Sequence, residues 1–174
     1  MEEEFRILHE KYPRLVPETT YFEHGPGWVG LLDKYFAEVD ATLPADIPWR
    51  NAQIKQKFGT LRLYCEPVWP DRKPTVLFEI AIINAGQQFV HEGHENELDE
   101  KLTWAKRLAE ARSAHICEEC GKPGRLVVSD YYYHTACEDH ADNGKPVEGE
   151  AVLTAGGKKY QYDPTLDEIV PVSD

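Results

Sequence analysis

The sequence predicts an α+β fold in which a small antiparallel sheet packs with two or three helices, followed by a compact Cys/His module and an acidic tail. Three observations lead to this prediction. An apolar stripe at helical spacing covers residues 28–43, a hairpin-like stretch covers 54–65, and a C-x-x-C pair at 117–120 is followed by a C-x-x-H pair at 137–140. We expect an α+β domain over residues 1–114, the Cys/His module over 115–143 and the acidic tail over 144–174.

The composition is that of a soluble protein. The chain has 174 residues, of which 41% are hydrophobic and 29% charged, and its formal net charge is -12. No stretch approaches the roughly 20 apolar residues that span a bilayer, and the N-terminus MEEEFRILHE lacks the basic flank of a signal peptide. We therefore expect no membrane association and a location in a reducing cytoplasm, where thiols bind metals more often than they form disulfides.

The first strong element is a helix over residues 28–43. Gly25-Pro26-Gly27 precedes it and Pro44 follows it, which are residues typical of helix ends. Before this helix, Pro13 and Pro17 exclude one long helix over residues 1–24. The apolar stripe, which we expect to pack on the sheet that follows, consists of Trp28, Leu31, Leu32, Tyr35, Phe36, Val39 and Leu43.

The stretch IKQKFGTLRLY, residues 54–64, predicts that sheet. Gly59-Thr60 fits a two-residue type II′ turn, with Gly at the first central position. In that register Lys57 lies opposite Arg62 and Lys55 lies opposite Tyr64. One face of the hairpin is then basic, and the other, which we expect to pack on the helix, carries Ile54, Phe58, Leu61, Leu63 and Cys65.

The basic face of this hairpin needs a negative partner. Six Lys and Arg stand against two acids between residues 50 and 73, and like charges directly opposite in a hairpin cost up to about 1 kcal/mol. The neutralising charge belongs either to a binding partner or to the chain's own carboxylates, and both alternatives stay open. The residues that we expect to contact an anion or a partner are Arg50, Lys55, Lys57, Arg62 and Tyr64.

The remaining segments are less regular. Residues 75–90 are apolar and ambiguous between a buried strand and a helix, with a slight preference for a helix. Apolar residues at helical spacing from Leu98 to Ala109 predict a second helix that ends near Ser113. After Gly144 we expect a loose acidic tail in which VLTAGGKKYQYD forms a weak hairpin.

The spacing of four side chains predicts a metal site. Cys117 and Cys120 form a C-x-x-C pair, and sixteen residues later Cys137 and His140 form a C-x-x-H pair. This is the pattern of a structural Cys3His zinc site, with four protein ligands and no position for water. Thr135 and Glu138 fit a capping box for a new helix, so turn, hairpin and helix together suggest a treble-clef-like zinc finger. As substitute ligands we considered His115 and His134.

No sequence pattern supports an enzyme. The segment from His91 to His94 resembles a truncated H-E-x-x-H signature, but its two His are three residues apart instead of four. Zinc deaminases need an H-x-E and a P-C-x-x-C, and neither is present. Cys65 falls on the predicted core face, where a small buried hydrophobe is expected instead of a nucleophile. We therefore expect a protein without catalytic activity.

Four motifs together resemble a family of small uncharacterised proteins of bacteriophages and prophages. These motifs are GWVGLLDKYF, QIKQKFGTLRLY, SAHICEECGKPGRL and TACEDHA, and the resemblance covers roughly residues 25–141. It implies a phage or bacterial cytoplasmic setting and brings no activity or functional residue with it.

Two hypotheses about function follow. The first is a zinc-stabilised protein-interaction module, such as a phage-borne inhibitor of a host defence or nuclease component, whose acidic surface over 138–174 binds a basic protein. The second is a nucleic-acid-binding accessory protein in which the basic 50–64 hairpin contacts phosphate, Tyr64 stacks on a base and Arg125 extends the path. The acidic net charge favours the first, because phosphate repels a net anion.

Overall fold

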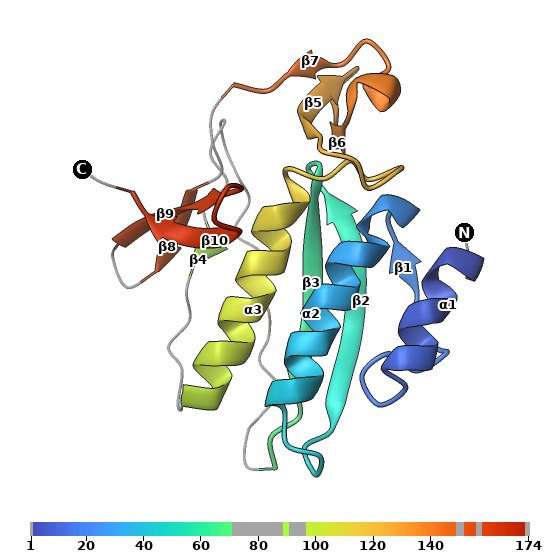
Figure 1. Cartoon of the computed structure of the whole chain (residues 1–174), viewed down its shortest axis with the longest axis vertical. Helices are drawn as coiled ribbons and strands as arrows, with labels where there is room; N and C mark the ends of the chain where they lie inside the picture. Colours follow the sequence, from blue (N-terminus) through green and yellow to red (C-terminus); the bar gives the residue numbers. More distant parts are fainter. Residues whose placement is uncertain (1, 71–88, 91–96, 149–151, 156–157, 173–174) are drawn as a thin grey trace.

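The computed structural model of the chain describes residues 2–70, 89–90, 97–148, 152–155 and 158–172. Within these residues the fold is α+β, as predicted, with three α-helices and three small sheets (Figure 1). The helices and short 3-10 helices are α1 (Glu2–Lys11), η1 (Pro26–Trp28), α2 (Val29–Thr42), α3 (Glu97–Ser113) and η2 (Glu138–His140). The strands are β1 (Phe22–Glu23), β2 (Trp49–Lys57), β3 (Thr60–Pro67), β4 (Phe89–Val90), β5 (Arg125–Ser129), β6 (Tyr132–Ala136), β7 (Lys145–Pro146), β8 (Val152–Ala155), β9 (Lys158–Asp163) and β10 (Glu168–Pro171).

The core lies between the first sheet and the two longest helices. In this sheet β1 runs parallel to β2, and β2 runs antiparallel to β3. Helices α2 and α3 cover one face of the β2–β3 hairpin (Figure 1). The predicted stripe of α2 is confirmed, because all seven of its side chains are buried. Helix α1, which the sequence analysis did not assign, ends before Pro13 and adds Phe5 and Leu8 to the same core.

The predicted register of the hairpin is wrong. The two central turn residues are Phe58 and Gly59, with φ of 52° and 78°, so the turn is of the I′ kind, and Lys57 pairs with Thr60. A type I′ turn matches the twist of the strands with Gly at its second position. Ile54, Leu61, Leu63 and Cys65 lie in the core as predicted, whereas Phe58 sits in the turn and is 44% exposed.

Helix α3 closes the outer edge of this sheet with two side chains. The backbone N–H of Leu61 donates to Ser113 Oγ at 2.8 Å, and that of Leu63 donates to Glu110 Oε1 at 3.0 Å. Ser113 Oγ in turn donates to the carbonyl oxygen of Glu110 at 2.6 Å. An open strand edge is a template for aggregation, and here the helix satisfies two of its donors. The helix predicted up to Ser113 is therefore confirmed and also protects strand β3.

The C-terminal segment is more ordered than the loose tail that we expected. Strands β8 and β9 form the predicted hairpin, and a further strand, β10, extends it. This sheet, in the order β10-β9-β8-β4, lies beside α3 (Figure 1), where the ring of Tyr160 contacts Trp104 edge to face. The helix favoured for 75–90 lies outside the described residues, except that Phe89–Val90 form strand β4. Among the helices of the described ranges, none is long and apolar enough to cross a membrane.

Candidate metal centre

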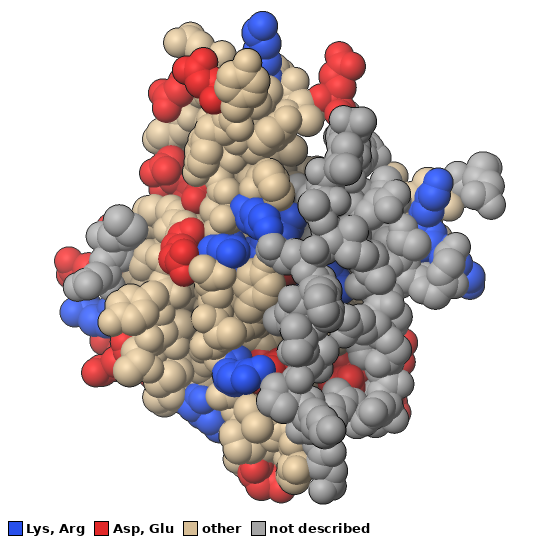
Figure 2. All heavy atoms as spheres, turned by 180° about the vertical axis from the view of Figure 1, so that it is seen from behind, with Lys and Arg blue, Asp and Glu red and all other residues tan. Residues whose placement is uncertain are grey.

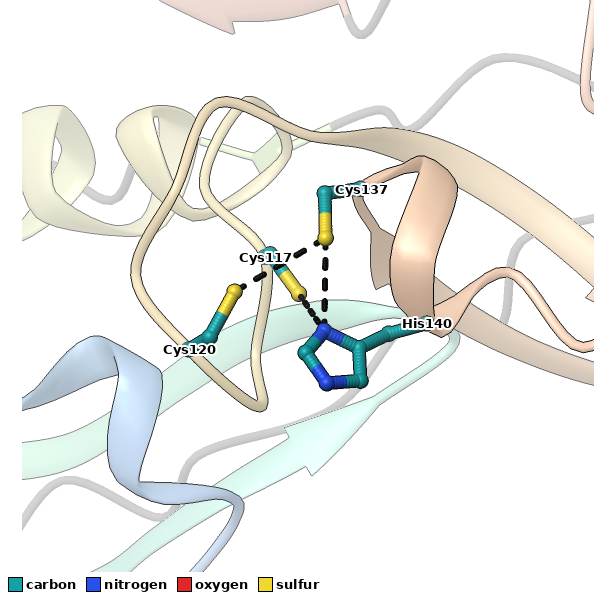
Figure 3. A group of neighbouring side chains, drawn as sticks. All are labelled: Cys117, Cys120, Cys137 and His140. Carbon is teal, nitrogen blue, oxygen red and sulfur yellow. Dashed lines mark hydrogen bonds between the residues drawn. The ribbon is translucent and has the colours of Figure 1, made fainter.

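The four predicted ligands come from two short turns that flank a hairpin. In the first turn Gly121, at φ 74°, lets its N–H donate to the carbonyl oxygen of Cys117 at 2.9 Å, which aims the thiols of Cys117 and Cys120 at one point. Strands β5 and β6 then form the predicted hairpin. The second turn is η2, which follows Cys137 and carries His140. Sequence elements 16 residues apart thus meet at one end of the hairpin (Figure 3).

The four side chains point toward one another at distances that suit one metal ion. Their ligand atoms all lie within 4.8 Å of each other. Cys120 Sγ lies 3.7 Å from Cys137 Sγ, and His140 Nδ1 lies 3.5 Å from Cys117 Sγ and 3.3 Å from Cys137 Sγ (Figure 3). Tetrahedral zinc, with Zn–S of about 2.3 Å and Zn–N of about 2.1 Å, requires S···S of about 3.8 Å and S···N of about 3.6 Å. The cluster therefore fits one tetrahedral ion, and the imidazole offers Nδ1 to it.

The electrostatics of the cluster favour a cation. Burial opposes ionisation of the Cys117 thiol, but the backbone N–H groups of Cys137, Cys120 and Glu119 point at its sulfur and lower its pKa to about 7. The sulfurs of Cys137 and Cys117 raise the pKa of His140. Because metals bind the thiolate, donors that stabilise Cys117 in that form preorganise the site.

Part of the predicted geometry around the site is wrong. The expected helix after Cys137 is one 3-10 turn, and Thr135 does not cap it. Instead Thr135 belongs to β6, and its hydroxyl donates to the carbonyl oxygen of Gly59 at 2.7 Å, because the β2–β3 turn lies close enough to compete for it. The substitute ligands His115 and His134 lie outside the cluster; their rings contact Tyr162 and Tyr132 respectively.

The loop before α2 packs directly on the metal-binding turn. The Gly27 N–H donates to the carbonyl oxygen of Glu118 at 2.7 Å, and the Gly25 N–H donates to Glu118 Oε1 at 3.0 Å. A Cβ on Gly27 would lie 2.2 Å from the carbonyl oxygen of Cys117, so only glycine fits. Sequence reasoning missed the role of Glu118, which is buried between the two ligands Cys117 and Cys120. The only signal for it was the pair of glycines flanking Pro26.

The turn of the β2–β3 hairpin packs on the other side of the module. A Cβ on Gly59 would lie 2.1 Å from Leu126 Cδ1, so the turn approaches β5 as closely as a glycine allows. Gln56 Nε2 donates to the Tyr132 hydroxyl at 2.9 Å and to the Tyr133 carbonyl oxygen at 2.8 Å. The glycines of two sequence motifs, one before α2 and one in the hairpin turn, thus both serve the joint between the α+β core and the metal-binding module.

Part of the positive charge of residues 50–64 is compensated within the chain. Arg50 forms an ion pair with Glu66, its cross-strand neighbour. Arg62 donates to the carbonyl oxygen of Leu61 at 2.8 Å and lies opposite Lys55. Lys55 Nζ lies 5.2 Å from the centre of the Tyr64 ring, and Lys57 Nζ lies 5.5 Å from that of Phe58. Figure 2 shows Lys and Arg side chains in separate small groups on the back of the molecule, interspersed with acidic ones. Contact of these residues with an external anion or partner stays a prediction.

The one cysteine outside the cluster has the properties of a core residue. Cys65 is buried on β3, and burial raises the pKa of its thiol to about 12, which keeps it protonated and unreactive. The segment from His91 to His94 lies outside the described residues.

Comparison of the chain with protein-family models, with curated proteins and with solved structures finds no match in any of the three.

Proposed function

We propose that this chain is a zinc-stabilised, non-enzymatic protein-interaction module of the bacterial cytoplasm, and that it acts as a phage-borne inhibitor of a host defence or nuclease component. The observation that carries the proposal is the closed Cys3His cluster at the joint of the fold. Three thiolates and an imidazole are the donor set of structural zinc, and four protein ligands leave no position for a substrate or water. The role of the metal is then to stabilise the fold, and the chain acts through its surface.

The charge of the chain indicates what this surface attracts. A formal net charge of -12 on 174 residues repels nucleic acid at long range and steers basic proteins toward the chain. The acids over 138–174 include Glu138 and Asp142 beside the metal site and Glu168 on β10. A basic groove that normally binds phosphate would also accept such carboxylates, which is how an acidic protein inhibits a nuclease.

Affinity capture with the zinc-loaded chain tests this function. The immobilised full-length chain is exposed to bacterial lysate, and the retained protein is purified and titrated against the chain by calorimetry. We expect a basic protein that binds with one-to-one stoichiometry and is released by salt. The Cys120→Ser variant, which loses a ligand, is expected to lose this partner. Retention that does not depend on zinc, or no saturable partner, would contradict the proposal.

A second candidate function is nucleic-acid binding, which one specific feature favours. On the outer face of the β2–β3 hairpin, Lys55 lies over the ring of Tyr64, so a cation and a stacking surface are adjacent. Such a pair suits single-stranded nucleic acid, where phosphate and base are contacted together. A salt titration of binding to single- and double-stranded DNA and RNA tests it. Lys55→Ala/Arg62→Ala would weaken binding, whereas Lys101→Ala on α3 serves as the control.

A further inference from the structure

The tip of the β5–β6 hairpin carries exposed aromatic residues. Exposure rises along β6 from Ala136, which is 2% exposed, to Tyr133 at 37%, Tyr132 at 59% and Tyr131 at 99%. Phe58, in the turn between β2 and β3, lies beside these residues. Its ring contacts that of Tyr133 edge to face, with the ring centres 6.5 Å apart. The base of the hairpin is therefore buried, whereas the ring of Tyr131 is fully exposed and those of Tyr132, Tyr133 and Phe58 are partly exposed.

The backbone of this tip is strained. Asp130 and Tyr131 both have positive φ, at 45° and 71°, in a two-residue turn. Glycine is the residue that such a turn favours at its second position, and a bulky side chain there is an outlier. The ring of Tyr131 gains almost nothing from the chain in return, because it is fully exposed. A strained, solvent-exposed aromatic residue points to a role outside the folded chain.

The neighbouring rings are held in place. Tyr132 stacks on His134 with ring centres 5.7 Å apart, and its hydroxyl accepts a hydrogen bond from Gln56. Tyr133 is held by the contact with Phe58. Aromatic side chains that are already positioned lose little conformational entropy on binding, which is why tyrosine is frequent at interaction hot spots.

The charge around the tip selects among partners. Asp130 stands in the turn of the tip itself, and the module over residues 115–143 as a whole has six carboxylates against two basic side chains. Asp130 and Glu119, both exposed, are among these acids. A patch that combines aromatic faces with carboxylates suits guanidinium groups, which stack on rings and pair with carboxylates at the same time.

We propose that Tyr131, Tyr132, Tyr133 and Phe58, which together we call the aromatic tip, form the contact surface for a basic protein that presents arginine side chains. This inference rests on the proposed function and assigns its site. The metal turn holds the base of the hairpin on the core, and the opposite end meets the partner.

The aromatic tip is tested with defined peptides. Ring resonances of the zinc-loaded full-length chain, labelled with 13C in tyrosine and phenylalanine, are followed during titration with a 12-residue Arg-Ala repeat peptide. The same titration is repeated with Lys-Ala and Glu-Ala peptides and with a 12-nucleotide oligo-dT. We expect shifts of the tip rings with the arginine peptide, smaller shifts with the lysine peptide because its ammonium is more strongly hydrated, and none with the glutamate peptide or the oligonucleotide.

Three variants locate the binding. Tyr131→Ser/Tyr132→Ser is expected to weaken the arginine peptide by about tenfold, and Tyr21→Ser, which removes another exposed aromatic ring, is expected to leave it unchanged. Tyr131→Gly relieves the strained turn, so it should weaken binding without lowering the melting temperature. One zinc per chain in each variant verifies that the module is folded.

Three outcomes of the titrations would overturn the inference. They are equal weakening by Tyr21→Ser, tighter binding of the oligonucleotide than of the arginine peptide, and unshifted tip rings at saturating peptide. If a basic protein captured from lysate binds Tyr131→Ser/Tyr132→Ser as tightly as the parent chain, the aromatic tip is not the contact surface, while the proposed function still stands. Failure of the capture itself, with the peptide still bound at the tip, would instead count against the proposed function.

Discussion

The indole N–H of Trp28 donates a hydrogen bond to the carbonyl oxygen of Ile116 at 2.8 Å. Trp28 is fully buried at the start of α2, and Ile116 directly precedes the metal ligand Cys117. The core of the α+β region and the metal-binding turn are therefore joined by a part-buried hydrogen bond. Because an ion held by the turn would also fix this bond, we expect metal binding and folding of the core to be coupled.

Removing one ligand is expected to release the metal. Cys120→Ser should reduce bound zinc from one ion per chain to nearly none and lower the melting temperature, because a structural zinc site contributes on the order of 10 kcal/mol to folding. Elemental analysis of purified protein, together with thermal unfolding, measures both effects. Cys65→Ala is the matched control: Cys65 lies outside the cluster, so this variant should keep one zinc and lose only packing. Full zinc occupancy in Cys120→Ser would contradict the assignment of the ligands.

Substitution of alanine for each of two glycines near the start of α2 is expected to change the stability of the fold differently. In Gly27→Ala the new Cβ would lie 2.2 Å from the carbonyl oxygen of Cys117, so the joint must open, at a cost of about 3 kcal/mol. In Gly30→Ala the new Cβ meets nothing within 4 Å, so the helix should be unchanged or gain up to about 1 kcal/mol. Urea unfolding with zinc present compares the two. Equal stability of both variants would show that the loop does not pack on the turn as described.

Sequence patterns identified the parts of this protein whose signals are local. The stripe from Trp28 to Leu43 has a helical period, and the spacing of the two Cys/His pairs is typical of side chains that share one metal site, so both could be predicted from the local sequence. The predicted hairpin register is wrong because the same sequence is compatible with a type II′ turn at Gly59-Thr60 and with a type I′ turn at Phe58-Gly59. What separates them is the close approach of Leu126, which is 67 residues away.

The joint itself could not be predicted, for the same reason. Thr135 fits an N-cap by sequence, but in the structure its hydroxyl bonds Gly59, a contact 76 residues away along the chain. Glu118 is buried and accepts a hydrogen bond from Gly25, a residue 93 positions away along the chain. Such tertiary contacts override local propensity, and nothing in the neighbouring sequence reports them.

The buried His24 is expected to make stability depend on pH. Its Nδ1 donates to the carbonyl oxygen of Gly25 at 2.8 Å, and burial lowers the pKa of the imidazole to about 4. In the unfolded chain the pKa is near 6.5, so the unfolded state binds the proton first. The contribution is therefore fully present above pH 6.5 and is lost as the pH falls toward 4, by up to about 3 kcal/mol.

His24→Asn measures this contribution. Asparagine can donate to the same carbonyl oxygen but does not titrate, so the variant should lose less stability than the parent chain between pH 6.5 and 4. Loss of zinc at low pH affects both proteins, and it cancels in the difference between their unfolding free energies. Parallel stability curves for the two proteins would contradict the burial of the neutral imidazole.

The ion pair between Arg112 and Asp167 is expected to hold the C-terminal sheet on α3. Arg112 donates from Nε to Oδ1 at 2.7 Å and from the guanidinium end to Oδ2 at 3.0 Å, and the Tyr162 hydroxyl donates to Oδ1 at 2.7 Å. Partial burial opposes ionisation of Asp167, but these donors lower the pKa of its carboxyl overall. A bidentate pair of this kind ties strand β10 to the end of the helix.

Asp167→Asn isolates that charge. Asp167 has φ of 56°, a conformation that asparagine also tolerates, so the turn survives while the ion pair is lost. Because the carboxylate is 44% exposed, the expected cost is only about 1 kcal/mol. It should appear as faster amide exchange in β9 and β10, with α2 unaffected. Lys34→Met is the control, since Lys34 lies 3.7 Å from the same carboxylate and is 66% exposed, so water screens that pair more strongly. If β9 keeps its protection in Asp167→Asn, apolar contacts such as that of Tyr160 with Trp104 hold the sheet instead.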